Sequence, residues 1–141
     1  MQTYIFPIKS GFLKGQLLEI LLSPAIEVAT PLPFEKGVAG KWSPEHLFTA
    51  AISSCFLTTF LAIAEYSKLE FTAIDVKAEG ILDKPEGKFL MTEVILRPKL
   101  VIAHEKDRDK AQRILEKSEA ACLITHSVKA DVKLEAEVEV G

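Results

Sequence analysis

Two thiols, Cys55 and Cys122, are the side chains in this sequence best suited to covalent chemistry. A thiolate can attack an electrophile such as the O–O bond of a peroxide and become a sulfenic acid, and a second thiol can then condense with it to a disulfide. The attacking thiol needs a lowered pKa, which a nearby cation or a helix N-terminus normally provides. The alternative interpretation is that each cysteine only fills the core, because cysteine is among the most buried residue types.

Glu45 precedes Cys55 by ten residues on a predicted helix. Ten residues correspond to about 15 Å along a helix axis, which excludes a direct contact between the two side chains within that helix. Glu45 can therefore take part only by orienting a cation or by reaching the cysteine of a second subunit. A carboxylate that stabilises the start of the helix is an equally good interpretation.

The histidines are His46, His104 and His126, and the last of these follows Cys122 by four residues. That spacing is compatible with a shared metal site or a Cys–His pair, but zinc sites normally offer three or four ligands at recognisable spacing. No phosphate-binding glycine motif is present either, since Gly37–Gly40 lacks the P-loop lysine. We predict no metal and no cofactor.

The clearest structural signal is a helix start at Ser43-Pro44-Glu45. A serine suits the N-cap, a proline suits the first helical position, and a glutamate is favoured in the first turn. We expect the helix to reach about Ser67 and, being apolar nearly all round, to lie buried between other elements. Before it, the first thirty residues have the pattern of short strands with a turn at Lys14-Gly15.

After this helix the sequence alternates between strands and a second helix. We predict a half-buried strand over residues 73–81, a turn over 84–87 and a returning strand over 89–102, with an edge or bulge at Pro98. An amphipathic helix over residues 105–121 and a regular final strand over 128–138 follow. This order predicts one α+β domain over residues 1–141, with an antiparallel-type sheet packed on the long helix.

Composition excludes several classes of function. A net charge of −3 with scattered lysines and arginines gives no basic surface for nucleic acid. The uncharged segment Leu47–Ala64 approaches the lower length limit for a membrane span, but its five hydroxyl residues favour a buried helix of a soluble protein. The N-terminal residues do not have the pattern of a signal peptide, so we expect a cytoplasmic protein with reduced thiols.

Two segments resemble the signatures of a known family. Residues 43–56, SPEHLFTAAISSCF, and residues 121–127, ACLITHS, resemble the two cysteine motifs of the OsmC/Ohr family, the osmotically inducible and organic hydroperoxide resistance proteins. The order of elements resembles that family over nearly the whole chain. The resemblance implies an intertwined α+β homodimer with two sites at the subunit interface.

The same resemblance implies roles for individual residues. Cys55 matches the peroxidatic cysteine, Cys122 the resolving cysteine, and Glu45 the glutamate that orients an arginine against the thiolate. That arginine belongs to the N-terminal region, whereas the first arginine of this chain is Arg97. Lys14 is the nearest cationic substitute, with other candidates at Lys9, Lys36 and Lys41, although a lysine lacks the bidentate fork of a guanidinium.

Two functions follow as hypotheses. The first is a thiol-dependent peroxidase that reduces organic hydroperoxides through Cys55 and Cys122 and is re-reduced by an external thiol or dithiol. The second is a relative that binds a small apolar, thiol or acyl ligand in the interface pocket with little or no peroxidase activity, which the missing arginine and the apolar residues near Cys55 favour. A purely structural dimeric module is a third possibility.

Overall fold

A computed structural model of the chain describes residues 3–5, 9–13, 16–19 and 26–141. These residues form two compact units, one within residues 1–47 and the other comprising residues 48–141. The single domain over residues 1–141 therefore stays a prediction.

The first unit contains two antiparallel strand pairs. β1 (Thr3–Ile5) pairs with β4 (Ile26–Val28), and β2 (Lys9–Leu13) pairs with β3 (Gln16–Glu19). This confirms the short strands expected in the first thirty residues. The predicted turn at Lys14-Gly15 lies outside the described residues.

The predicted helix start is confirmed. Helix α1 spans Pro44–Tyr66, and the backbone N–H of His46 donates a hydrogen bond of 3.2 Å to the Ser43 hydroxyl, as an N-cap requires. The helix ends where Lys68 adopts a φ of 52° and the Leu69 N–H donates to the Ala64 carbonyl over 2.9 Å. A residue in this left-handed region closes a helix by turning the chain away from its axis.

The second unit is built on a sheet of four strands. β5 (Phe71–Asp83) and β6 (Leu90–Ile102) form an antiparallel hairpin, and helix α2 (Arg108–Ala120) leads from β6 to the last strands. β7 (Asp131–Leu134) and β8 (Glu137–Val140) both pair with β6 in parallel. The α+β class is confirmed, but the antiparallel sheet holds only for the hairpin, because the crossover through α2 returns the chain in the direction of β6.

Pro98 explains why the last strand is broken. The sequence predicted one strand over residues 128–138, whereas the structure interrupts the pairing between Leu134 and Glu137. The interruption lies opposite Pro98, which has no N–H to donate to a neighbouring strand. The prediction that Pro98 marks an edge was wrong, because β6 has partners on both sides and the irregularity falls on its neighbour.

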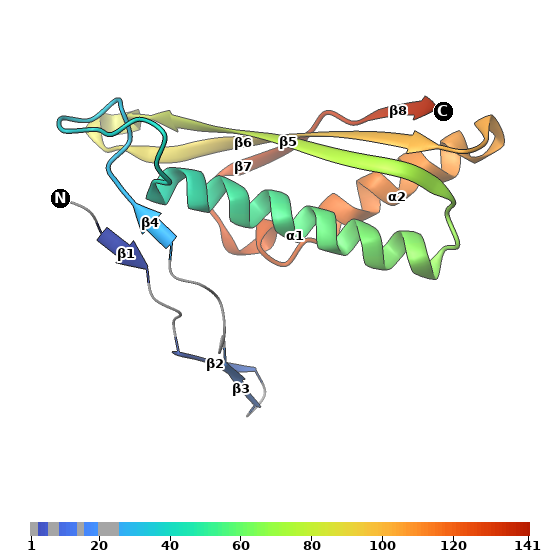
Figure 1. Cartoon of the computed structure of the whole chain (residues 1–141), viewed down its shortest axis with the longest axis horizontal. Coiled ribbons are helices and arrows are strands. Elements are labelled where there is room, and N and C mark those ends of the chain that lie inside the picture. Colours follow the sequence, from blue (N-terminus) through green and yellow to red (C-terminus); the bar gives the residue numbers. More distant parts are fainter. Residues whose placement is uncertain (1–2, 6–8, 14–15, 20–25) are drawn as a thin grey trace. The chain divides into compact units, whose positions relative to one another are not determined.

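The core lies between the sheet and the two helices, which cover the same face of the sheet (Figure 1). Helix α1 contributes one stripe of buried residues to this core: Ile52, Phe56, Phe60 and Ala64. The expectation that α1 is buried all round is therefore wrong for the single chain, since the sheet covers only one side of the helix. By length and composition α1 could cross a membrane, and 22% of its most apolar window is buried.

Gly80 on β5 allows α1 to approach the sheet closely. A Cβ atom placed on Gly80 would lie 2.2 Å from the Thr49 hydroxyl oxygen and 2.7 Å from the Met91 Cε atom. Both distances are far shorter than van der Waals contact, so a side chain at this position would push the helix away from the sheet. Gly80 thus helps to place the N-terminal half of α1, which leads to Cys55.

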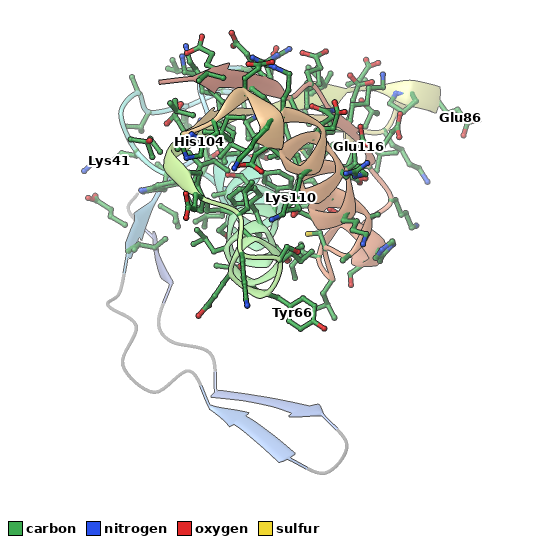
Figure 2. The ribbon with its side chains drawn as sticks, turned by 90° about the vertical axis from the view of Figure 1, so that its right-hand side faces the viewer. Lys41, Tyr66, Glu86, His104, Lys110 and Glu116 are labelled. Carbon is green, nitrogen blue, oxygen red and sulfur yellow. The ribbon has the colours of Figure 1, made fainter. Side chains whose placement is uncertain are left out.

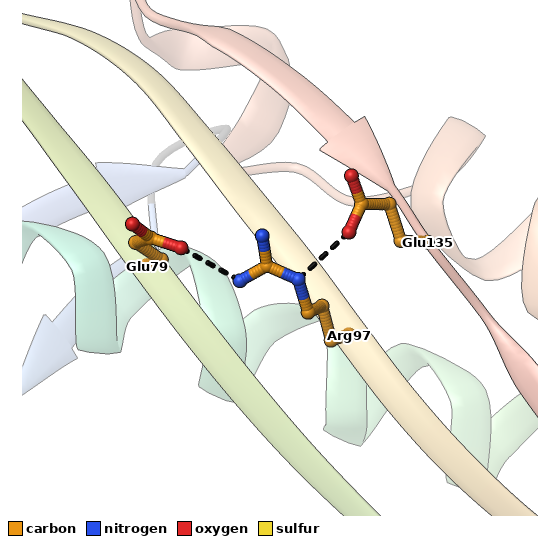
Figure 3. A network of polar contacts seen from close by, with 3 residues as sticks. All are labelled: Glu79, Arg97 and Glu135. Carbon is orange, nitrogen blue, oxygen red and sulfur yellow. Dashed lines mark hydrogen bonds and ion pairs between the residues drawn. The ribbon is translucent and has the colours of Figure 1, made fainter.

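The opposite face of the sheet is covered by ion pairs. Arg97 on β6 bonds the carboxylates of Glu79 and Glu135, each over 2.7 Å, and so links β5, β6 and the segment after β7 (Figure 3). Lys99 pairs with Glu139 over 2.8 Å, and Lys133 pairs with Glu93. The alternation expected for the last strand is confirmed, with charges outward and apolar residues toward the core. This face has the character of a solvated surface.

Candidate functional site

The two cysteines, 67 residues apart in the sequence, are neighbours in the second unit. Cys55 lies in the middle of α1, and Cys122 follows the end of α2. Each thiol is near enough to the other to shift its pKa, and both thiols are free. Cys55 is half-buried, whereas Cys122 is fully buried. The pair therefore has one sulfur that solvent reaches and a second directly behind it.

The loop after α2 places Cys122 through its own backbone. The Cys122 N–H donates to the Glu119 carbonyl over 3.1 Å, which continues the last turn of the helix. The chain then folds into a short 3₁₀ turn, Thr125–Ser127, and the Thr125 N–H donates to the Cys122 sulfur over 3.5 Å. The amides of Leu123 and Ile124, between these points, are among the groups that lower the pKa of Cys55. The same tight turn thus acts on both thiols.

The pKa of Cys55 is lowered, and its causes can be separated. Burial raises the pKa of this thiol, but hydrogen bonds from the Cys122 thiol, the Ile124 amide, the Thr59 hydroxyl and the Leu123 amide together outweigh burial. Each donor stabilises the thiolate more than the thiol. These donors are all uncharged, so the lowering does not require the cation that the sequence led us to expect.

The pKa of Cys122 moves in the opposite direction. Burial raises the pKa of Cys122, the hydrogen bond with Cys55 raises it further, and the Thr125 hydroxyl and amide only partly offset these effects. Two neighbouring thiols thus have opposite tendencies to ionise. Of the two thiols, Cys55 is therefore the one that ionises more readily, and Cys122 is the one that keeps its proton to higher pH.

We expect Cys55 to be alkylated by iodoacetamide at lower pH than free cysteine. Because the pKa of Cys55 is lowered in the folded protein, its thiolate forms at a lower pH than the thiolate of free cysteine. The pH at which the alkylation rate reaches half its plateau should therefore lie below about 8.5, the ordinary pKa of a thiol. The measurement is the rate of modification against pH, with the labelled residue identified by mass spectrometry. A midpoint at or above that of free cysteine would contradict this assignment.

Glu45 belongs to the first unit, as do the candidate lysines. It lines a cavity of about 530 Å³ with mostly apolar walls that include Val28, Pro31, Phe34 and Val38. Lys36 lines the same cavity, whereas Lys41 forms an ion pair with Glu27. Lys14 lies outside the described residues. The roles predicted for Glu45 and Lys14 stay predictions.

His126 is bonded to the backbone near the second thiol. Its Nε2 atom hydrogen-bonds the Ala120 carbonyl over 2.6 Å, which ties the loop to the end of α2. His46 is bonded to the N-cap, with 2.8 Å between its Nδ1 atom and the Ser43 hydroxyl. In the part of the chain that the structure describes, no group of three or more His, Cys, Asp or Glu side chains is arranged to hold a metal ion.

Residues 37–137 match the family model described as OsmC-like protein. The chain belongs to the OsmC-like family. Its relatives include the uncharacterized protein YmaD of Bacillus subtilis, 29% identical over 70% of this chain and 67% of the relative. Peroxiredoxin OsmC of Escherichia coli is 27% identical over 74% of this chain and 70% of the relative.

Among solved structures, an OsmC-like protein of unknown function from Vibrio cholerae superposes with a TM-score of 0.72. The two proteins are 28% identical, and the alignment covers 80% of this chain and 77% of that one. The family resemblance of the two cysteine segments and the expected fold class are thereby confirmed. The matched region includes Glu45, Cys55 and Cys122 and leaves out Lys14.

The structure adds residues to the site that sequence analysis missed. Thr59 lies one helical turn after Cys55, a spacing that places both side chains on one side of α1. That spacing could have drawn attention to it. The amides of Leu123 and Ile124 had no comparable signal, because their position near Cys55 depends on how the loop after α2 packs against α1.

Proposed function

We propose that this OsmC-like protein is a thiol-dependent peroxidase that reduces organic hydroperoxides through Cys55 and Cys122. The observation that carries the proposal is a pair of neighbouring thiols that shift each other's pKa, with the pKa of the half-buried Cys55 lowered and that of the buried Cys122 raised. The name of the Escherichia coli relative, peroxiredoxin OsmC, supports the same class of reaction.

The reaction balances with the two thiols and one hydroperoxide. The Cys55 thiolate attacks the outer peroxide oxygen, the O–O bond breaks, and the alkoxide leaves as an alcohol after taking up a proton, so that Cys55 becomes a sulfenic acid. The Cys122 sulfur then attacks the Cys55 sulfur, a disulfide forms and water leaves. An external thiol or dithiol returns the disulfide to two thiols by exchange.

The direct test is a stoichiometric reaction of the reduced protein. One equivalent of cumene hydroperoxide should consume both thiols, one equivalent of cumyl alcohol should appear, and the mass of the chain should fall by the two hydrogens of a new disulfide. Hydrogen peroxide serves as the comparison for organic preference. A reaction no faster than that of free cysteine would end the proposal.

The proposal also includes Glu45 and a lysine, which act on the Cys55 of a second subunit. Glu45 orients a cation toward the Cys55 thiolate of the partner, which accounts for the distance between the two residues along α1. Lys14 is the first candidate for this cation, as the substitute for the arginine of the family. Lys36, which lines the same cavity as Glu45, is the alternative. Replacing each lysine by glutamine, followed by peroxide kinetics, distinguishes the two.

A homodimer is proposed because of the outward face of α1. Ala51, Leu61 and Ala62 are exposed there, and no charged residue occurs between Leu47 and Ala64. The Thr58 hydroxyl donates to carbonyls of its own helix, so this face offers mainly alkyl surface to a partner. A second copy of α1 is the occupant proposed, in keeping with a soluble family member.

Leu61→Glu is expected to convert the dimer into a monomer. The side chain of Leu61 is 44% exposed in the single chain, and a carboxylate there would be buried without a partner at the interface. Sedimentation equilibrium of the parent and the variant measures the change. A parent that is already monomeric, or a variant that stays dimeric, would contradict the proposed interface.

The second candidate function is ligand binding without turnover. The cavity lined by Val28, Phe34 and Glu45 favours it, because a small apolar ligand would fit its walls. A binding protein would retain both thiols when challenged with cumene hydroperoxide. The stoichiometric reaction described above therefore separates the two functions.

A further inference from the structure

A buried hydroxyl lies beside the second cysteine and is unusual in its bonding. It belongs to Thr125, whose Oγ1 atom is shielded from solvent and makes no hydrogen bond to any residue that the structure describes. Buried polar groups in folded proteins are nearly always bonded, and an exception calls for an explanation such as a redox or catalytic role. The chemistry of the neighbouring groups supplies one for this hydroxyl.

The nearest reactive group is the sulfur of Cys122. The backbone N–H of Thr125 donates to the Cys122 Sγ atom over 3.5 Å, so this residue already contacts the sulfur through its main chain. The Cys122 side chain is 0% exposed, which keeps water away from the sulfur. A threonine side chain has a few staggered rotamers, and these bring its hydroxyl toward or away from a sulfur that lies beside its own amide.

The surroundings of Cys122 oppose a negative charge on its sulfur. Its N–H donates to the Glu119 carbonyl at the end of α2, where a helix carries partial negative charge. The titratable residues beside it in the chain are Glu119 and His126, and the His126 ring is bonded to a backbone carbonyl. Burial and Cys55 on α1 both raise the pKa of Cys122, whereas the hydroxyl and the amide of Thr125 lower it.

We propose that Thr125 is a further residue of the reactive site: its buried hydroxyl donates a hydrogen bond to the Cys122 sulfur when that sulfur loses its proton. A thiol sulfur is a weak acceptor and a thiolate is a strong one, so this bond gains strength as the charge develops. Its part in disulfide formation rests on the proposed function. The hydrogen bond to the Cys122 thiolate does not, and it can be tested without any peroxide.

The step that this hydrogen bond assists is the condensation of the Cys55 sulfenic acid with the second thiol. The Cys122 sulfur gives up its proton and bonds to the Cys55 sulfur, the S–O bond breaks, and the hydroxyl group takes up the proton and leaves as water. Burial disfavours the anion on the attacking sulfur. The Thr125 hydroxyl offsets that effect, so it speeds closure of the disulfide and leaves the earlier attack on the peroxide unchanged.

The first experiment titrates Cys122 in a Cys55→Ser background, where it is the remaining thiol. The ultraviolet absorbance of the thiolate is followed against pH, after subtraction of a variant that lacks both cysteines. Thr125→Val removes the hydroxyl and keeps the shape. It should move the midpoint up by about one pH unit, because a hydrogen bond to a charged group is worth at least about a tenfold change in ionisation.

Thr125→Ser should return the midpoint to that of the parent, and Thr125→Ala gives a second test of the lost hydroxyl. Ser127→Ala is the matched control from the same turn, because the Ser127 hydroxyl is already bonded to the Leu123 carbonyl over 2.9 Å. Circular dichroism of each variant establishes that the fold is intact. A Thr125→Val midpoint that stays at the parent value, or that Ser127→Ala reproduces, would overturn the inference.

The second experiment measures closure of the disulfide in chains that retain both cysteines. The reduced protein is oxidised with cumene hydroperoxide in the presence of dimedone, and mass spectrometry gives the ratio of labelled chain to disulfide at each pH. A midpoint raised by one unit lowers the thiolate fraction about tenfold, while the more basic thiolate attacks about threefold faster. For Thr125→Val we therefore expect closure about threefold slower than in the parent at pH 6, with the difference shrinking toward the midpoint.

The two experiments separate this inference from the proposed function. A raised midpoint together with slower closure at low pH supports both. A raised midpoint in a protein whose parent form reduces peroxide no faster than free cysteine leaves the Thr125 hydrogen bond established and ends the proposed peroxidase. In an active peroxidase, an unmoved midpoint, unchanged closure, or closure slowed by one constant factor at every pH ends the inference about Thr125 alone.

Discussion

Cys55→Ser is expected to lower the rate of cumene hydroperoxide reduction by at least about a thousandfold, to the level of the uncatalysed reaction. A serine hydroxyl does not ionise near neutral pH, so the donors that hold the Cys55 thiolate have no anion to stabilise. The size of the effect follows from the proposed mechanism, in which the Cys55 sulfur is the atom that attacks the peroxide. Stopped-flow kinetics with the reduced protein measure it.

Cys122→Ser is the matched control, because it removes the second sulfur and keeps a hydroxyl that can donate to Cys55. This variant should still consume one equivalent of hydroperoxide and then stop, since the sulfenic acid has no thiol with which to condense. Trapping with dimedone should label Cys55 in this variant. Equal rates for the Cys55→Ser variant and the parent would show that the chemistry lies elsewhere.

Phe60→Ala is expected to destabilise the fold by about 3–5 kcal/mol. Phe60 is 0% exposed, and its ring meets that of Phe71 edge to face at a centroid distance of 5.4 Å, so its removal leaves a cavity between α1 and the sheet. Such a loss is a large part of the roughly 5–15 kcal/mol that stabilises a typical domain. Urea unfolding followed by circular dichroism measures the change in midpoint.

Tyr66→Ala is the control for this prediction. Tyr66 projects into solvent from the end of the same helix and is 90% exposed in the single chain (Figure 2). Its removal should change the unfolding free energy by less than about 0.5 kcal/mol. Both variants are compared with the parent at equal protein concentration, because association would make the midpoint depend on concentration. Similar losses for the two variants would contradict the packing described for α1.

The sequence was a good guide wherever a structure depends on near neighbours. The start of α1 could be predicted because Ser43 caps it through an amide three residues away. The final strands could be predicted from their alternation, and α2 from its apolar stripe. Each of these signals is contained in a short window, since the hydrogen bonds and periodicities that produce it span only a few residues.

Predictions failed where a structure depends on residues distant in the sequence. The direction of β7 and β8 relative to β6 depends on the path of the α2 crossover, which no local pattern contains. The break opposite Pro98 could not be placed on the neighbouring strand without knowing the register. The composition of α1 likewise could not tell which of its faces the sheet covers.

By itself the sequence determined the two cysteine segments, the helix that carries Cys55 and the order of elements around it. The tertiary structure alone decided that Cys55 and Cys122 are neighbours, and that Thr59 and two loop amides lower the pKa of Cys55. The physical reason is that a thiol's pKa depends on burial and on donors within hydrogen-bonding distance. Folding brings those donors together from α1 and from the loop after α2, which lie more than sixty residues apart in the chain.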